Sequence, residues 1–127
     1  DRAVQRAINK GMIIVAAAGN DGPTSPPRYP AAFENVIAVT AVDHKQAVFK
    51  DAVRGPHIDF AAPGVDVLVS SGAGPRYVTG TSIAAPFVSG RIAADKAVLA
   101  QQSARGVRAM LAADAKDAGP PGDDAVY

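Results

Sequence analysis

The stretch of sequence that decides the fold is GMIIVAAAGNDG, residues 11–22. Residues 12–16 are apolar throughout and rich in β-branched side chains, which is typical of a short strand buried on both faces of a sheet. Residues 1–10 place their apolar side chains at helical spacing, and Gly11 is suited to end that helix. A helix joined by one glycine to a doubly buried strand is half of a parallel α/β unit.

The rest of the chain extends this α/β pattern. Residues 19–30 are rich in glycine and proline and predict a long irregular loop. Short strands are expected at 36–42, 48–49, 58–62, 65–69 and 77–78, a buried helix at 82–100, and a second helix capped by Ser103. The predicted fold class is α/β, with a mostly parallel sheet flanked by helices in one domain.

Composition excludes several classes of function. The chain has 127 residues, 48% of them hydrophobic and 20% charged, and its net charge is +1. No basic block is present, so the sequence gives no sign of a nucleic-acid interface. The longest apolar stretch, residues 12–18, is too short to cross a bilayer. Because there is no cysteine, disulfides, thiolate chemistry and cysteine-based zinc sites are excluded.

The first candidate site follows the strand at 12–16. Ala17, Ala18 and Gly19 leave space at the carboxyl end of that strand, where open parallel sheets bind ligands. Asn20 carries a neutral amide donor that could point into this space. The alternative interpretation is a turn asparagine before Asp-Gly.

The second candidate site opens the helix at 82–100. Ser82 follows Gly80 and Thr81, so its hydroxyl would lie beside free backbone N–H groups and the positive end of the helix dipole. That environment suits a nucleophile whose attack creates an oxyanion. The alternative interpretation is that the serine or threonine simply caps the helix.

The remaining polar residues suggest no further site. His44 and His57 are both interpreted as solvated loop residues, and their spacing does not match a metal-ligand set. The glycines match neither of the two phosphate-binding patterns, G-x-G-x-x-G and G-x-x-x-x-G-K-[ST]. We therefore expect no metal site on these residues, and a nucleotide-binding α/β domain is disfavoured.

Taken together, these motifs resemble the C-terminal half of the catalytic domain of subtilisin-like serine proteases (subtilases, the peptidase S8 family). The likeness is an ordered set of segments and not one motif. It covers residues 11–22, 29–39, 59–64, 80–90 and 107–116, and so nearly the whole chain. The resemblance implies a partial subtilisin-like fold in which residues 1–127 are a C-terminal fragment of one catalytic domain.

The resemblance also implies roles for individual residues. Ser82 would be the acylated nucleophile of a serine endopeptidase acting on polypeptide substrates. Asn20 and the backbone N–H of Ser82 would stabilise the oxyanion, with Thr81 supporting that hole. Residues 17–19 and Gly80 would contact the substrate. Calcium, and a location in the secreted fraction or the cell envelope, are implied by resemblance only.

One departure from the family pattern is large. Subtilases order their catalytic residues Asp, His, Ser along the chain, and here no Asp-Ser/Thr-Gly or His-Gly-Thr segment precedes Ser82. Both ends of the chain are interpreted as cuts through a larger protein, with the N-terminal half of the domain missing. The fragment is therefore expected to be inactive alone, and to self-associate or swap through the sheet edge at residues 12–16. The alternative is a catalytically dead subtilase-like module that serves binding or structure.

Overall fold

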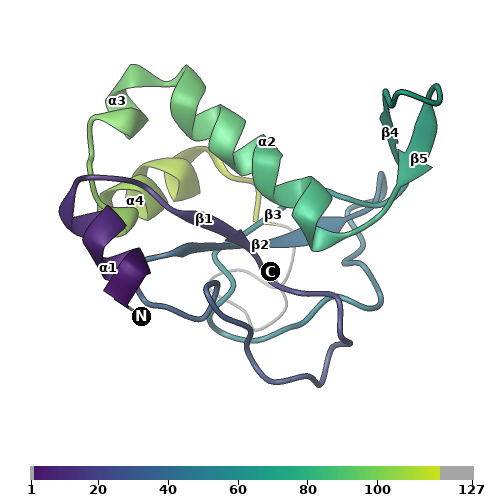
Figure 1. Cartoon of the computed structure of the whole chain (residues 1–127), viewed down its shortest axis with the longest axis horizontal. Helices are drawn as coiled ribbons and strands as arrows, with labels where there is room; N and C mark the ends of the chain where they lie inside the picture. The colour runs from purple at the N-terminus through teal and green to yellow at the C-terminus, as the bar shows by residue number, and fades with distance from the viewer. Residues whose placement is uncertain (1, 118–127) are drawn as a thin grey trace.

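The computed structural model describes residues 2–117, which form a small parallel sheet covered by helices (Figure 1). The expectations stated above for residues 118–127 lie outside this described range. The elements in chain order are α1 (Arg2–Asn9), β1 (Val15–Ala17), β2 (Ile37–Val42), β3 (Phe60–Pro63), β4 (Val67–Val69), β5 (Arg76–Val78), α2 (Thr81–Ala94), α3 (Lys96–Leu99) and α4 (Ala104–Asp114).

The main sheet has the strand order β1-β2-β3, and both pairs of neighbours are parallel. Ala16 lies opposite Ala38 in the first pair, and Thr40 lies opposite Ala61 in the second. Strands β4 and β5 form a separate antiparallel hairpin. The α/β class and the parallel sheet expected from the sequence are confirmed. The carboxyl ends of three strands consequently meet at one edge of the sheet.

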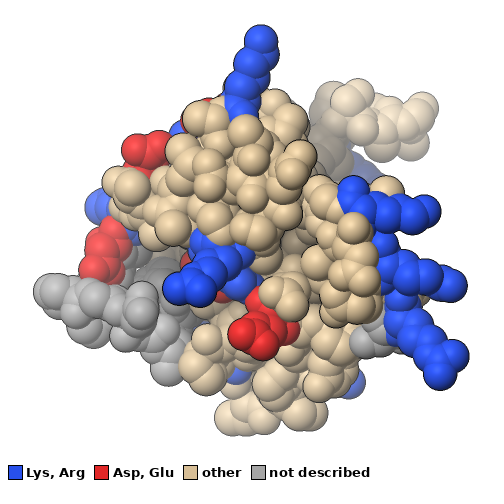
Figure 2. All heavy atoms as spheres, turned by 90° about the vertical axis from the view of Figure 1, so that its left-hand side faces the viewer, with Lys and Arg blue, Asp and Glu red and all other residues tan. Residues whose placement is uncertain are grey.

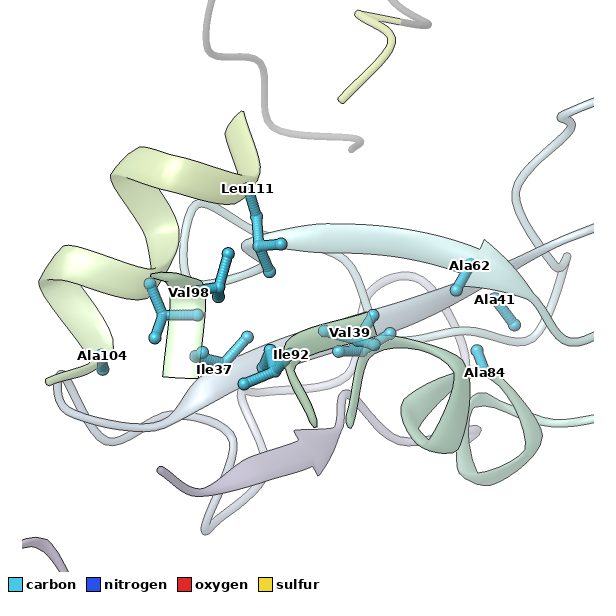
Figure 3. Packing of buried hydrophobic residues seen from close by; sticks show 11 residues of the cluster. Ile37, Val39, Ala41, Ala62, Ala84, Ile92, Val98, Ala104 and Leu111 are labelled. Atoms are coloured by element: carbon cyan, nitrogen blue, oxygen red, sulfur yellow. The ribbon is translucent and has the colours of Figure 1, made fainter. Parts of the chain in front are cut away.

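The larger core lies on the face of the sheet that α2 covers. Ile37, Val39 and Ala41 alternate along β2 and point to this face, as the two-residue period of a strand requires. Figure 3 shows these side chains packed against residues of α2, α3 and α4. The buried members of this cluster are Ile37, Val39, Ala41, Ala62, Ala84, Val88, Ile92, Val98, Ala104, Val107 and Leu111.

A second, smaller core lies on the other face. Val36 and Ala38 alternate with the residues of the first core and pack with Ala16 and Ala18 from β1 and the residues after it. Val4 of α1 packs against this cluster, so α1 covers the face opposite to α2. The sheet is thus the middle layer between helices, as the sequence indicates for the α/β class.

Several element boundaries shift by one or two residues, the strand expected at 48–49 is only an isolated bridge between Val48 and Val42, and two elements differ more strongly from the expectation. The strand expected at 12–16 is β1 at Val15–Ala17, and Met12 is 56% exposed instead of doubly buried. Pairing with β2 begins at Ile14, whose carbonyl oxygen accepts the N–H of Ile37 at 2.9 Å, and at Val15, which lies opposite Ile37. The helix expected at 82–100 is broken at Asp95, whose carboxylate caps α3.

A polar junction ties α4 to the sheet. Arg108 of α4 donates to both carboxylate oxygens of Asp59, at 2.6 and 3.1 Å, and to the carbonyl oxygen of Val36 at 2.7 Å. Asp59 also accepts the backbone N–H of Ala38 at 2.8 Å. These groups are largely removed from water, so their mutual hydrogen bonds are the main compensation for their lost hydration. The junction fixes the start of β2 and the segment before β3 relative to α4.

The surface carries both signs of charge. Figure 2 shows the side of the molecule on which Figure 1 places α1 and α3, where Lys and Arg gather along one edge and most of the face is uncharged. Within residues 2–117, no helix has the length and the apolar composition that a bilayer-spanning helix requires.

Candidate active site

A tight turn after β1 determines where Asn20 points. Gly19 has a φ of +112°, in the region that disfavours residues with a side chain. A Cβ on Gly19 would lie only 3.1 Å from Arg28 Cγ and from Val53 Cγ2. The carbonyl oxygen of Gly19 also accepts the N–H of Val53 at 3.0 Å. The turn is therefore held from two sides, and glycine is the residue that fits it.

The start of α2 determines where Ser82 points. Gly80 is the N-cap of this helix, and no side chain caps it. The alternative that Thr81 or Ser82 acts as a helix cap is therefore wrong. Thr81 is fully buried, whereas Ser82 is exposed. The two neighbouring hydroxyls thus lie in different surroundings.

Three hydrogen bonds join the two candidate segments. The backbone N–H of Gly19 donates to Thr81 Oγ1 at 3.1 Å. The backbone N–H and the hydroxyl of Thr81 both donate to Asn20 Oδ1, at 2.9 and 3.0 Å. The alternative that Asn20 is a local turn asparagine is wrong, because its acceptor oxygen is used by a residue far away in the sequence.

These bonds also fix the orientation of the Asn20 amide. A backbone N–H can only donate, so the side-chain atom that faces Thr81 has to be the oxygen. The Nδ2 group then points the other way. A Cβ built on Gly80 would lie 3.5 Å from Asn20 Nδ2 and 3.4 Å from Ser82 Oγ. The amide donor and the serine hydroxyl therefore border the same small space beside Gly80.

A second donor lies at the same helix start. The first N–H groups of an α-helix have no acceptor within the helix. The N–H of Thr81 is taken by Asn20, but the N–H of Ser82 has no acceptor among residues 2–117. The dipole of the 14-residue helix α2 adds partial positive charge at this point. The space beside Gly80 is thus suited to negative charge.

The backbones of Gly64 and Gly80 pack closely and hold the start of α2 in place. The N–H of Gly80 donates to the carbonyl oxygen of Gly64 at 2.8 Å. A Cβ on Gly64 would lie 2.6 Å from the Cβ of Ala41 and 2.8 Å from the carbonyl oxygen of Gly80. The sequence pattern identifies Gly64 only as a turn residue after Pro63. Its packing role depends on a contact with a segment that is distant in the sequence, so no local pattern could show it.

Residues 17–19, which are predicted to contact the substrate, differ in their exposure to solvent. Ala17 and Gly19 are partly exposed, whereas the side chain of Ala18 lies in the smaller core. Beside Gly19, the Nε of Arg28 forms an ion pair with Asp21 at 3.0 Å. Both charged side chains are about half exposed, so this pair contributes little to stability.

The histidines do not join the candidate site. His44 is exposed, and no side chain among residues 2–117 accepts a hydrogen bond from Ser82 Oγ. The expectation that His57 is solvated is wrong, because both of its ring nitrogens are buried without a hydrogen-bond partner in the described structure. Burial lowers the pKa of His57, and the nearby Asp59 carboxylate opposes that shift. The sequence Gly55-Pro56 predicts a turn and therefore an exposed histidine, but after this turn the ring nitrogens of His57 are buried.

Metal binding finds no support in the described residues. Between residues 2 and 117, no group of three or more His, Asp or Glu side chains is placed to hold a metal ion. The chemistry available is that of a hydroxyl next to two fixed N–H donors. This combination suits acyl transfer, in which a nucleophile attacks a carbonyl and the carbonyl oxygen becomes negatively charged.

Comparison with known proteins agrees with this chemistry. A family model described as "Subtilase family" matches residues 1–127. The thermophilic serine proteinase of Bacillus sp. (strain AK1) is 48% identical over 92 residues, which are 71% of this chain and 22% of that protein. The minor extracellular protease Epr of Bacillus subtilis (strain 168) is 38% identical over 93 residues, which are 72% of this chain and 14% of Epr.

A solved structure of a protease also resembles this chain. The prenylagaramide maturation protease PagA superimposes with a TM-score of 0.79 at 28% sequence identity, covering 98% of this chain and 48% of PagA. The chain therefore spans about half of PagA and less than a quarter of the two sequence relatives described above.

Proposed function

Because the chain belongs to the subtilase family, we propose that it carries the nucleophile and the oxyanion-binding groups of a serine endopeptidase. The observation that supports this most directly is the position of Asn20 Nδ2 and Ser82 Oγ around one space beside Gly80. Two groups that must act on a single carbonyl have to be neighbours, and two segments that are distant in the chain meet here.

In the proposed reaction, Ser82 Oγ attacks the carbonyl carbon of the scissile peptide bond and forms a new C–O bond. The hydroxyl proton passes to a base and then to the leaving amine as the C–N bond breaks. The carbonyl oxygen carries negative charge in the tetrahedral intermediate, where Asn20 Nδ2 and the N–H of Ser82 would hold it. Water then hydrolyses the acyl-enzyme.

Thr81 has a supporting role in this proposal. It binds Asn20 Oδ1 through two groups, which keeps the amide nitrogen turned toward the reacting carbonyl. Substrate would contact Ala17, the backbone of residues 18 and 19, and Gly80. Ala18 would act through its backbone because its side chain is buried.

The base and its orienting carboxylate are proposed to come from the part of a subtilase that this chain does not span. A serine without a base is a weak nucleophile near neutral pH. We therefore expect the 127-residue chain by itself to show no peptide hydrolysis above its Ser82→Ala variant. Hydrolysis by the isolated chain that disappears in this variant would contradict the proposal.

The proposal is tested by labelling the full-length protein with a fluorophosphonate and locating the adduct by mass spectrometry. We expect one adduct on Ser82 and none in the Ser82→Ala variant. Ser89 lies on the same helix and is also exposed, so Ser89→Ala serves as the matched control and should label normally. Absence of an adduct in the full-length protein would overturn the assignment.

A catalytically dead binding or structural module is the second candidate. Within residues 2–117 no group accepts a hydrogen bond from Ser82 Oγ, so this candidate applies if the rest of the domain supplies no base either. The two candidates make opposite predictions for the fluorophosphonate experiment, because a dead module does not activate its serine.

The proposal also includes a cellular location for the protein. Epr is named an extracellular protease, and we propose a secreted or cell-envelope location that fractionation of the producing cells would test. Calcium is implied by family resemblance alone.

We further propose that the free edge of β1, which in the described structure pairs only with β2, promotes self-association of the isolated chain. A monomer at all concentrations in light scattering would contradict this.

A further inference from the structure

The β4–β5 hairpin carries an exposed apolar pair close to the candidate site. Leu68 of β4 lies directly opposite Tyr77 of β5, so both side chains stand on the same face of the hairpin. Leu68 is 58% exposed and Tyr77 is 69% exposed. Figure 1 shows the hairpin projecting from the body of the molecule beyond the start of α2.

The exposed pair is not needed for packing in the described structure. The side chains that alternate with it, Val67, Val69 and Val78, are partly buried on the opposite face of the hairpin. Leucine and tyrosine that remain in water lose the stabilisation that burial would give them. Exposed apolar side chains that lie side by side on one face can serve as a contact with another molecule.

The hairpin also has free edges. Within residues 2–117, β4 and β5 pair only with each other, so each has one edge whose backbone groups have no strand partner. An extended polypeptide can add to such an edge through main-chain hydrogen bonds while its side chains contact the neighbouring face. The chemistry of this surface therefore fits an extended polypeptide with apolar side chains at alternate positions.

The base of the hairpin is tied to the candidate site. The N–H of Asp66 donates to Thr79 Oγ1 at 2.9 Å, and the Thr79 hydroxyl lies 3.4 Å from Asp66 Oδ1. The next residue, Gly80, is held by its hydrogen bond to Gly64. The chain from the end of β5 to Ser82 spans at most about 14 Å when fully extended. A polypeptide on the hairpin could thus continue to the nucleophile.

We propose that the β4–β5 hairpin is a second docking site for the polypeptide substrate, with Leu68 and Tyr77 contacting apolar side chains outside the residues next to the cleaved bond. This rests on the proposed endopeptidase function. The substrate is favoured over a second copy of the chain because β5 leads through Thr79 and the anchored Gly80 directly to Ser82.

Direct binding tests the proposal without depending on catalysis. The probe is a fluorescein-labelled, unstructured peptide of about 20 residues with valine or leucine at alternate positions, titrated into full-length Ser82→Ala protein. A Leu68→Thr/Tyr77→Thr variant keeps the strand preference and removes the apolar face. We expect its Kd in fluorescence anisotropy to rise about tenfold. The control Leu99→Gln, at a leucine 50% exposed on α3, should bind with unchanged Kd.

Kinetics give a second, independent measurement. For the full-length protein with Ser82 intact, kcat/KM for a long unfolded polypeptide should fall about tenfold in the Leu68→Thr/Tyr77→Thr variant. The value for a tetrapeptide amide should stay unchanged. If the double variant folds poorly by circular dichroism, Tyr77→Thr alone replaces it, with a smaller expected change in the same direction.

The outcomes separate the two proposals. Loss of all hydrolysis and fluorophosphonate labelling would refute the endopeptidase function, while the anisotropy titration would still decide the docking site. Equal Kd values for the double variant and the Leu99→Gln control would overturn the docking site. So would a double variant that loses self-association in sedimentation but keeps peptide affinity, because the occupant would then be a second copy.

Discussion

Asn20 Oδ1 accepts two hydrogen bonds from Thr81, one from its backbone N–H at 2.9 Å and one from its hydroxyl at 3.0 Å. The same hydroxyl accepts the N–H of Gly19 at 3.1 Å. One buried threonine thus connects the turn after β1 with the start of α2. The direction of the Asn20 amide nitrogen depends on this contact.

Replacing Thr81 by valine should therefore affect stability and turnover together. The variant keeps the shape of the side chain but leaves the partly buried N–H of Gly19 without its acceptor, which costs about 1 kcal/mol in free energy of unfolding. We also expect kcat for peptide hydrolysis by the full-length protein to fall about tenfold, because Asn20 loses one of its two restraints.

The control for this substitution is Thr24→Val, in the exposed loop after β1. It makes the same chemical change, and urea unfolding and kcat should both stay within error of the parent protein. A Thr81→Val protein with normal kcat would show that the backbone N–H of Thr81 suffices to orient Asn20.

Replacing Asn20 by aspartate should reduce turnover far more than it reduces substrate affinity. The carboxylate has nearly the same shape but replaces the N–H donor by a negatively charged oxygen. Removal of one oxyanion donor costs on the order of 10²–10³ in kcat, a magnitude measured for a subtilisin, which belongs to the same family. Steady-state kinetics of the full-length variant should show this loss with KM changed less than about threefold.

Replacing Gly64 by alanine should disrupt the support of the site. The new methyl group would lie 2.6 Å from the Cβ of Ala41 and 2.8 Å from the carbonyl oxygen of Gly80. We expect a loss of about 1–3 kcal/mol in the free energy of unfolding, since overpacking displaces backbone. Gly72→Ala is the matched control, because a Cβ there meets no atom within 4 Å. Equal denaturant midpoints for the two variants would contradict the packing argument.

Burial of His57 predicts a stability that depends on pH. Because burial lowers its pKa in the folded state, the unfolded chain binds the proton more readily. The free energy of unfolding should be insensitive to this residue above pH 6.5, the ordinary pKa of histidine, and should decrease as the pH falls from there through the lowered pKa. Urea unfolding over a pH range of about 5 to 8 would measure it.

The His57→Gln variant should flatten that part of the stability profile. His44→Gln, at an exposed position, should leave the profile as it is in the parent protein. An unchanged slope in the His57→Gln variant would show that other groups carry the pH dependence.

The sequence predicts the class of the fold because that class depends on local patterns. Apolar runs and helical spacing predict the parallel sheet, and Ser103 correctly marks the start of α4, where it accepts the N–H of Gly106. The break at Asp95 is not predicted, because the alanines on both sides of it favour a continuous helix. The short extent of β1 is not predicted either, because strand length depends on the neighbouring strand.

The candidate site was predictable in its members but not in its contacts. Asn20, Thr81 and Ser82 stand in recognisable motifs, and the structure places all three around Gly80. The roles of Gly64 and Asp66 arise from contacts with residues 79 and 80, and local sequence has no signal for them. His57 shows the opposite error, since a loop motif predicts exposure and tertiary folding buries both ring nitrogens.

The close approach of Gly64 and Gly80 has a consequence for which changes this chain can tolerate. Any enlargement at residue 64 would shift the segment that ends in Ser82, so the nucleophile and the end of β3 are mechanically coupled. Insertions or length changes that tune specificity are therefore best tolerated farther out, in the turn between β4 and β5, where added chain leaves the reactive geometry undisturbed.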